Sequence, residues 1–121
     1  MRKRFKKLKG IAKRDPKMTS RKSLDEIRKI LKNHERELKK KYGVKRIGLF
    51  GSYVRGEQKE GISDLDILVE FKPGARISLL DFVGLENYLS DLLGIKVDLV
   101  EKSTLKPTIG KRVLGEIVYL W

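Results

Sequence analysis

The sequence contains no cysteine and only one histidine, His34, among its 121 residues. The absence of cysteine excludes a disulfide framework, a thiolate zinc site and a cysteine nucleophile. A single histidine also argues against a histidine-based metal centre and a serine–histidine catalytic triad. Any catalysis by this chain therefore depends on carboxylates, hydroxyls and basic side chains.

Long apolar segments are also missing. No apolar run approaches the roughly 20 residues that a membrane-spanning helix requires, and the first residues lack the apolar core of a secretory signal. We therefore expect a soluble, cytoplasmic protein without membrane contact. A hydrophobic fraction of 40%, with 37% charged residues, suffices for one folded core and argues against a fully disordered chain.

The net charge of +13 is concentrated at one end of the chain. The first 46 residues carry 20 lysines and arginines against five acidic residues, whereas the remaining residues carry nine against eleven. We predict a basic, flexible arm over residues 1–22, in which Pro16 interrupts any helix, and one folded domain over residues 23–121. The arm is either an electrostatic tail without a specific ligand or a contact for RNA or an acidic partner.

The order helix, strand, strand, helix, strand, helix predicts an α/β or α+β domain in which helices cover a small sheet. The first helix opens with a capping box formed by Ser23 and Glu26, and it is expected to run unbroken for about five turns to Gly43. His34 falls on or beside its apolar stripe and is expected to be a packing or boundary residue. A second capping box begins at Ser78, and the helix that it opens is expected to carry a broad apolar stripe and to end at a left-handed cap, Gly94. Helices are predicted over residues 24–42, 79–93 and 108–114, and strands over residues 44–50, 64–71 and 95–100.

Two aspartates stand out in the predicted strand over residues 64–71. Because side chains alternate along a strand, Asp64 and Asp66 point to the same face, with Cα atoms roughly 6–7 Å apart. Two like charges on one face repel each other, and a divalent cation would neutralise both. Oxygen ligands favour hard ions such as Mg²⁺ or Mn²⁺, whose coordination is commonly completed by substrate phosphates.

Other residues point to the same chemistry. Asp98 shares a face with Lys96 and Val100, so it reaches the same site if its strand lies beside the first. Gly51 allows close approach of a backbone, and Ser52, next to it, offers a hydroxyl and an amide. Residues 53–56 are expected to start a short helix whose N-terminus favours phosphate, with Arg55 as a fork-shaped donor.

Each pattern is common by itself, but the set in this order predicts metal-dependent phosphate chemistry. Two ions about 3.5–4 Å apart, bridged by shared carboxylates, support in-line displacement at phosphorus. One ion activates the attacking oxygen and the other neutralises the leaving pyrophosphate. The reaction that this arrangement suggests is nucleotidyl transfer.

Four segments of the chain are similar to the motifs of one known family. The segments are Gly51-Ser52-Tyr53-Val54-Arg55-Gly56, Ser63-Asp64-Leu65-Asp66-Ile67-Leu68-Val69, Lys96-Val97-Asp98-Leu99-Val100 and the closing Glu116-Ile117-Val118-Tyr119. They resemble minimal nucleotidyltransferases of the DNA polymerase beta superfamily, over roughly residues 24–121. The basic arm lies outside this resemblance.

The resemblance implies a small mixed sheet flanked by helices, two Mg²⁺ ions and a nucleoside triphosphate, most often ATP. It implies that Asp98, besides binding metal, deprotonates an acceptor hydroxyl. The metal ligands that it implies are Asp64, Asp66 and Asp98, and the residues that it implies for the triphosphate are Gly51, Ser52 and Arg55.

Members of this group resemble antitoxins that are paired with HEPN ribonuclease toxins and adenylylate a tyrosine of the toxin. The resemblance therefore implies transfer of AMP to a protein hydroxyl, with a HEPN-type toxin as partner. Two alternatives stay open from the sequence. One is a binding module that neutralises its partner by docking alone, and the other is an RNA-binding enzyme that modifies RNA through residues 1–22.

Overall fold

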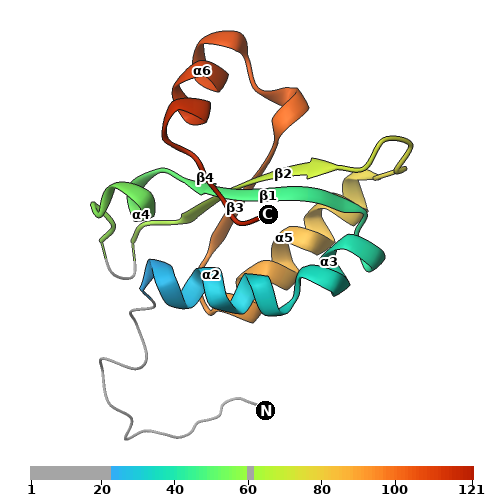
Figure 1. Ribbon diagram of the computed structural model, residues 1–121, viewed down its shortest axis with the longest axis horizontal. Helices are drawn as coiled ribbons and strands as arrows, with labels where there is room; N and C mark the ends of the chain where they lie inside the picture. The colour runs from blue at the N-terminus through green and yellow to red at the C-terminus, as the bar shows by residue number, and fades with distance from the viewer. Residues whose placement is uncertain (1–22, 60–61) are drawn as a thin grey trace, which may run out of the picture.

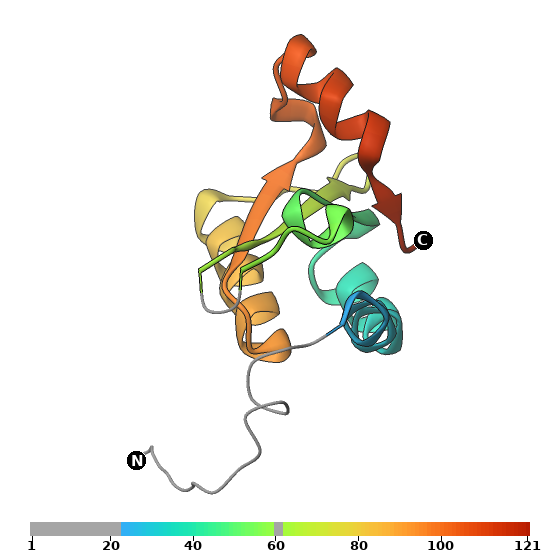
Figure 2. The same ribbon diagram turned by 90° about the vertical axis from the view of Figure 1, so that its left-hand side faces the viewer.

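The computed structural model describes residues 23–59 and 62–121 of the chain, so the predicted basic arm, residues 1–22, lies outside the described residues. Three helices, α2, α3 and α5, cover one face of a sheet, and α6 stands on the opposite side (Figures 1 and 2). No helix in the described part is both long and apolar enough to cross a membrane. In chain order the elements are α2 (Leu24–Asn33), α3 (Glu35–Lys41), β1 (Val44–Phe50), α4 (Ser52–Arg55), β2 (Leu65–Phe71), α5 (Leu79–Leu93), β3 (Val97–Glu101), a 3₁₀ turn (Lys102–Thr104), α6 (Pro107–Glu116) and β4 (Val118–Tyr119).

The sheet is mixed, as predicted, with the strand order β3-β2-β1-β4. Strand β1 pairs antiparallel with both β2 and β4, whereas β2 and β3 run parallel. The parallel pair is joined by α5, which crosses from the end of β2 to the start of β3. The predicted third strand begins two residues late, at Val97, because its ladder with β2 starts only where Leu65 pairs with Val97. Strand β3 is left at an edge of the sheet.

The core lies between the sheet and helices α2, α3 and α5. The alternation predicted for β2 is confirmed: Leu65, Ile67 and Val69 are fully buried against this helical layer, together with Leu85 and Leu89 of α5. Burying such side chains stabilises the fold by about 1.5–3 kcal/mol each. Because successive strand residues alternate, the residues between them face the side of the sheet that these helices leave open.

The prediction of one unbroken helix over residues 24–42 is wrong, because His34 separates α2 from α3. The backbone of His34 leaves the helical region, with φ −106° and ψ 11°. Its ring Nδ1 donates to the carbonyl of Ile30 at 2.8 Å, which is the carbonyl that the His34 amide would use in a continuous helix. The amide pairs instead with Leu31. The capping box at Ser23 and the left-handed Gly43 are both as predicted.

Helix α5 matches its prediction at both ends, from the capping box of Ser78 and Asp81 to the left-handed Gly94. Its apolar stripe is wider than the face that it buries, because Leu79 and Leu80 are 77% and 83% exposed.

The Ser78 cap provides a test of the fold. In Ser78→Ala the amide of Asp81 loses the hydroxyl that accepts its hydrogen bond at 3.0 Å, so the free energy of unfolding should fall by about 1 kcal/mol. Urea denaturation measures this change, with Ser103→Ala, at an exposed position of the 3₁₀ turn, as the control. Equal stability of the two variants would contradict the contribution of the cap.

Candidate active site

The structure brings the three predicted aspartates to one place on the open face of the sheet. Asp66 of β2 and Asp98 of β3 are direct cross-strand partners in the parallel ladder. Asp64 precedes β2 by one residue and lies on the same face as Asp66 by strand alternation. The charges of Asp64 and Asp98 both raise the pKa of Asp66, so both carboxylates lie within electrostatic reach of it.

The Asp66 carboxyl is in an unfavourable environment for a negative charge. Partial burial and then the charges of Asp98 and Asp64 raise its pKa to about 6, while Arg55 partly offsets them. A bound cation would relieve this repulsion and favour the ionised form. The donor set therefore fits a hard divalent ion, since all three side chains supply oxygen.

The protein alone does not form a complete metal cage in the described residues. Within that part of the chain, no three histidine, cysteine, aspartate or glutamate side chains are placed to hold a metal ion together. Mg²⁺ is commonly bound by one or two carboxylates, with water and substrate phosphates as the other ligands. The Asp66 and Asp98 pair meets this requirement, and the assignment of Asp64, Asp66 and Asp98 as metal ligands stays a prediction.

The predicted glycine–serine turn lies directly against Asp66. Gly51 follows β1, is buried, and has φ +83°, a conformation that favours glycine. A Cβ atom at this position would collide with Oδ2 of Asp66 and lie 3.0 Å from its Cγ. The carbonyl of Gly51 accepts hydrogen bonds from the amides of Val54 and Arg55 at 3.0 and 3.1 Å. Ser52 begins the short helix α4 that was predicted here. The turn thus places Ser52 next to the glycine that is packed on Asp66.

Arg55 is also held at the site. Its Nε donates to Glu57 at 2.9 Å and its Nη1 donates to both carboxylate oxygens of Glu116 at 3.0 Å. These two partners, Glu57 first, raise the pKa of Arg55 further above its ordinary value, at which an arginine is already charged at physiological pH. Its position at the site agrees with the prediction, whereas its contact with phosphate stays a prediction.

Glu116 is the site residue whose role the sequence did not indicate. In the sequence it is only the first residue of the closing segment, Glu116-Ile117-Val118-Tyr119, that carries the resemblance. In the structure its Oε2 accepts the Gly51 amide at 2.7 Å, across 65 positions of sequence. That bond, with Arg55 as the next favourable contact, lowers the pKa of Glu116. One signal was present: a negative charge is unfavourable in the last turn of a helix, so a glutamate that ends α6 needs a partner outside it.

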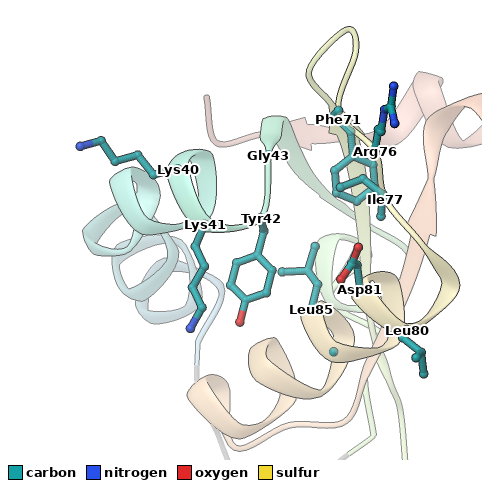
Figure 3. Close-up of a pocket in the computed structure, with 12 residues that line it drawn as sticks. Lys40, Lys41, Tyr42, Gly43, Phe71, Arg76, Ile77, Leu80, Asp81 and Leu85 are labelled. Atoms are coloured by element: carbon teal, nitrogen blue, oxygen red, sulfur yellow. The ribbon is translucent and has the colours of Figure 1, made fainter.

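A hollow of about 490 Å³ lies elsewhere on the molecule. Figure 3 shows it between the end of α3 and the start of α5, with Tyr42, Phe71 and Leu80 among its lining residues and Lys40 and Arg76 at its margin. Phe71 is at the opposite end of β2 from Asp66. This hollow is therefore separate from the acidic site.

Comparison with known proteins gives a consistent result. A sequence profile described as the nucleotidyltransferase domain matches residues 31–120. The protein adenylyltransferase MntA of Thermococcus cleftensis is 56% identical over 98 residues, which cover 81% of this chain and 96% of that protein.

Solved structures agree with the sequence comparison. A chain of a toxin–antitoxin complex with AMP-PNP aligns with a TM-score of 0.60 and 27% identity, over 74% of this chain and 71% of that chain. A chain of the Shewanella oneidensis complex between a tri-AMPylated HEPN toxin and an MNT antitoxin shares the fold, with a TM-score of 0.56 and 23% identity over 78% and 71% of the two chains.

Proposed function

Because the chain belongs to the nucleotidyltransferase domain family, we propose that it transfers AMP from ATP to a hydroxyl group of a partner protein, with Mg²⁺ and with release of pyrophosphate. One observation carries the proposal: the carboxylates of Asp66 and Asp98 are cross-strand neighbours, and Gly51 is packed against the first of them. An acidic pair beside a glycine–serine turn is suited to a metal-bound triphosphate.

The aspartates and the turn have different tasks in this proposal. Asp66, partly buried between the strands, its cross-strand partner Asp98 and Asp64, before the strand, hold the metal. Ser52 and the Gly51 turn hold the triphosphate, and Arg55 balances its negative charge. Mg²⁺, when bound, supplies positive charge to the phosphate oxygens and to the leaving pyrophosphate. The side chains thereby fix the α-phosphorus in line with an incoming hydroxyl.

Asp98 is suited to the proton transfer. It lies on the edge strand β3 and is exposed, whereas its neighbour Asp66 is partly buried. An acceptor can therefore reach Asp98 from outside the sheet. In the proposed step the acceptor hydroxyl gives its proton to Asp98, its oxygen bonds to the α-phosphorus, and the bond from that phosphorus to the pyrophosphate oxygen breaks.

A protein acceptor is supported by the relatives. The Thermococcus protein, which this chain matches over nearly its whole length, is a protein adenylyltransferase. The structural neighbour at 27% identity is part of a toxin–antitoxin complex and was solved with an ATP analogue. We therefore propose that the acceptor is a HEPN-type toxin and that the chain acts as its antitoxin.

The test is transfer of label from α-labelled ATP into a lysate of the organism that makes this chain. Labelled protein is expected with the wild-type chain and Mg²⁺, and no label is expected with Asp66→Asn or with EDTA. Labelled RNA in place of protein would favour the RNA alternative and would contradict a protein acceptor. Equal labelling by Asp66→Asn would contradict the assignment of the site, and full neutralisation of the toxin by that variant would favour a binding module.

A further inference from the structure

The carboxylate of Glu116 connects the C-terminal helix to the glycine–serine turn. It accepts the Gly51 amide at 2.7 Å and two hydrogen bonds from Arg55 Nη1 at 3.0 Å. Its side chain is 24% exposed, so these contacts are partly shielded from water. Gly51 and Arg55 are two of the three residues that the proposed function assigns to the triphosphate.

This glutamate is placed where a negative charge is otherwise unfavourable. It ends α6, where the helix dipole opposes it, and its charge adds to the repulsion on Asp66. The three short contacts with Gly51 and Arg55 offset both effects, because hydrogen bonds to charged groups are the stronger ones. The position of Glu116 is therefore better explained by a role in the site than by a contribution to the stability of α6.

Hydrogen bonds hold Gly51 at both its amide and its carbonyl. Its amide is bound to Glu116, and its carbonyl accepts the amides of Val54 and Arg55 at the start of α4. Since Gly51 has φ +83° and no side chain, these hydrogen bonds and its packing on Asp66 define the orientation of the backbone here. Without Glu116, the Gly51 amide would lose this hydrogen bond, and the turn that carries Ser52 would be held by the Gly51 carbonyl but no longer by its amide.

We propose that Glu116 is a positioning residue of the nucleotide site: it holds the Gly51 amide and the Arg55 guanidinium in the orientation that lets Ser52 and Arg55 bind the triphosphate. The inference rests on the proposed function. The opposite role is that Glu116 occupies donors that phosphate would otherwise use. The two roles predict changes of opposite sign when Glu116 is removed.

The experiment measures binding of a non-hydrolysable ATP analogue with Mg²⁺ by calorimetry, for the full chain and three variants. Glu116→Ala should weaken binding about tenfold. Glu116→Gln, which keeps an oxygen for the Gly51 amide, should restore most of the loss. Glu57→Ala is the matched control, because Glu57 binds the same guanidinium at 2.9 Å but does not contact Gly51, and it should change binding less than about twofold.

Steady-state transfer gives a second measurement. Glu116→Ala should raise KM for ATP by a similar factor while kcat changes less than about threefold. The reason is that the residue affects binding of the triphosphate and does not act on the reacting hydroxyl. A variant that is merely less stable would lose active protein and lower kcat at unchanged KM. If Glu116→Ala does not fold, Glu116→Gln and Glu116→Asp are compared with Glu57→Ala in the same assays.

Outcomes against the inference are distinct from outcomes against the function. Equal or tighter binding by Glu116→Ala would overturn the positioning role and show that the glutamate competes with phosphate. Equal losses in Glu116→Ala and Glu116→Gln would overturn the role of the Gly51 hydrogen bond. A wild-type chain that binds no analogue would overturn the proposed function, and this inference with it.

Discussion

Replacing Asp66 with asparagine is expected to lower nucleotide transfer at least about 10³-fold while leaving the fold intact. The loss follows because Asp66 is the carboxylate at the centre of the site, between Asp98, its ladder partner, and Asp64. An amide keeps the size of the side chain but removes the charge that a metal requires. Incorporation of label from α-labelled ATP measures the effect.

The same variant should be at least as stable as the wild type. Burial and two neighbouring carboxylates act against the charged form of Asp66, so its removal relieves repulsion on the order of 1 kcal/mol at neutral pH. Asp91→Asn, at an exposed position of α5, is the matched control and should change neither activity nor stability. Loss of transfer together with unfolding would assign Asp66 a structural role and contradict this account.

Replacing Gly51 with alanine is expected to lower the free energy of unfolding by about 3 kcal/mol or more and to reduce transfer at least about tenfold. Alanine is strained at φ +83°, and its Cβ would collide with the Asp66 carboxylate. To admit the methyl group, either the turn or Asp66 must move, and both belong to the site. Thermal unfolding and transfer assays measure the two effects.

A substitution at Gly56 distinguishes backbone strain from the collision with Asp66. This glycine also has a positive φ, of +73°, but a Cβ at Gly56 would meet no atom within 4 Å. Gly56→Ala should therefore show backbone strain alone, about 1 kcal/mol, with transfer nearly unchanged. If Gly51→Ala and Gly56→Ala behave alike, the close packing of Gly51 on Asp66 is not what the site depends on.

The parts of the fold that the sequence predicted are those set by local rules. The capping boxes at Ser23 and Ser78, the left-handed Gly43 and Gly94 and the strand over residues 44–50 all lie where they were expected. Alternation along β2 also placed Asp64 and Asp66 on the face away from the core. These features depend on residues within one turn or one strand of each other.

Other features depend on contacts that the sequence pattern does not contain. The break at His34 arises because one ring nitrogen binds the Ile30 carbonyl, which no helical periodicity reveals. The sequence predicted that Asp98 reaches Asp66 only if the two strands are neighbours, because alternation does not reveal which strands pair or in which direction. The structure shows that they pair in parallel. Glu116 was missed as a site residue because its bond to Gly51 joins residues that are 65 positions apart in the sequence.

The central claim is that this acidic site attaches AMP to a partner protein, and the intact mass of that partner tests it most directly. The proposed partner, a HEPN-type protein, is incubated with ATP, Mg²⁺ and either the wild-type chain or Asp66→Asn. The account predicts a mass increase of one or more AMP units with the wild type only. An unchanged partner mass with a wild-type chain that binds ATP and Mg²⁺, or the same increase with Asp66→Asn, would contradict it.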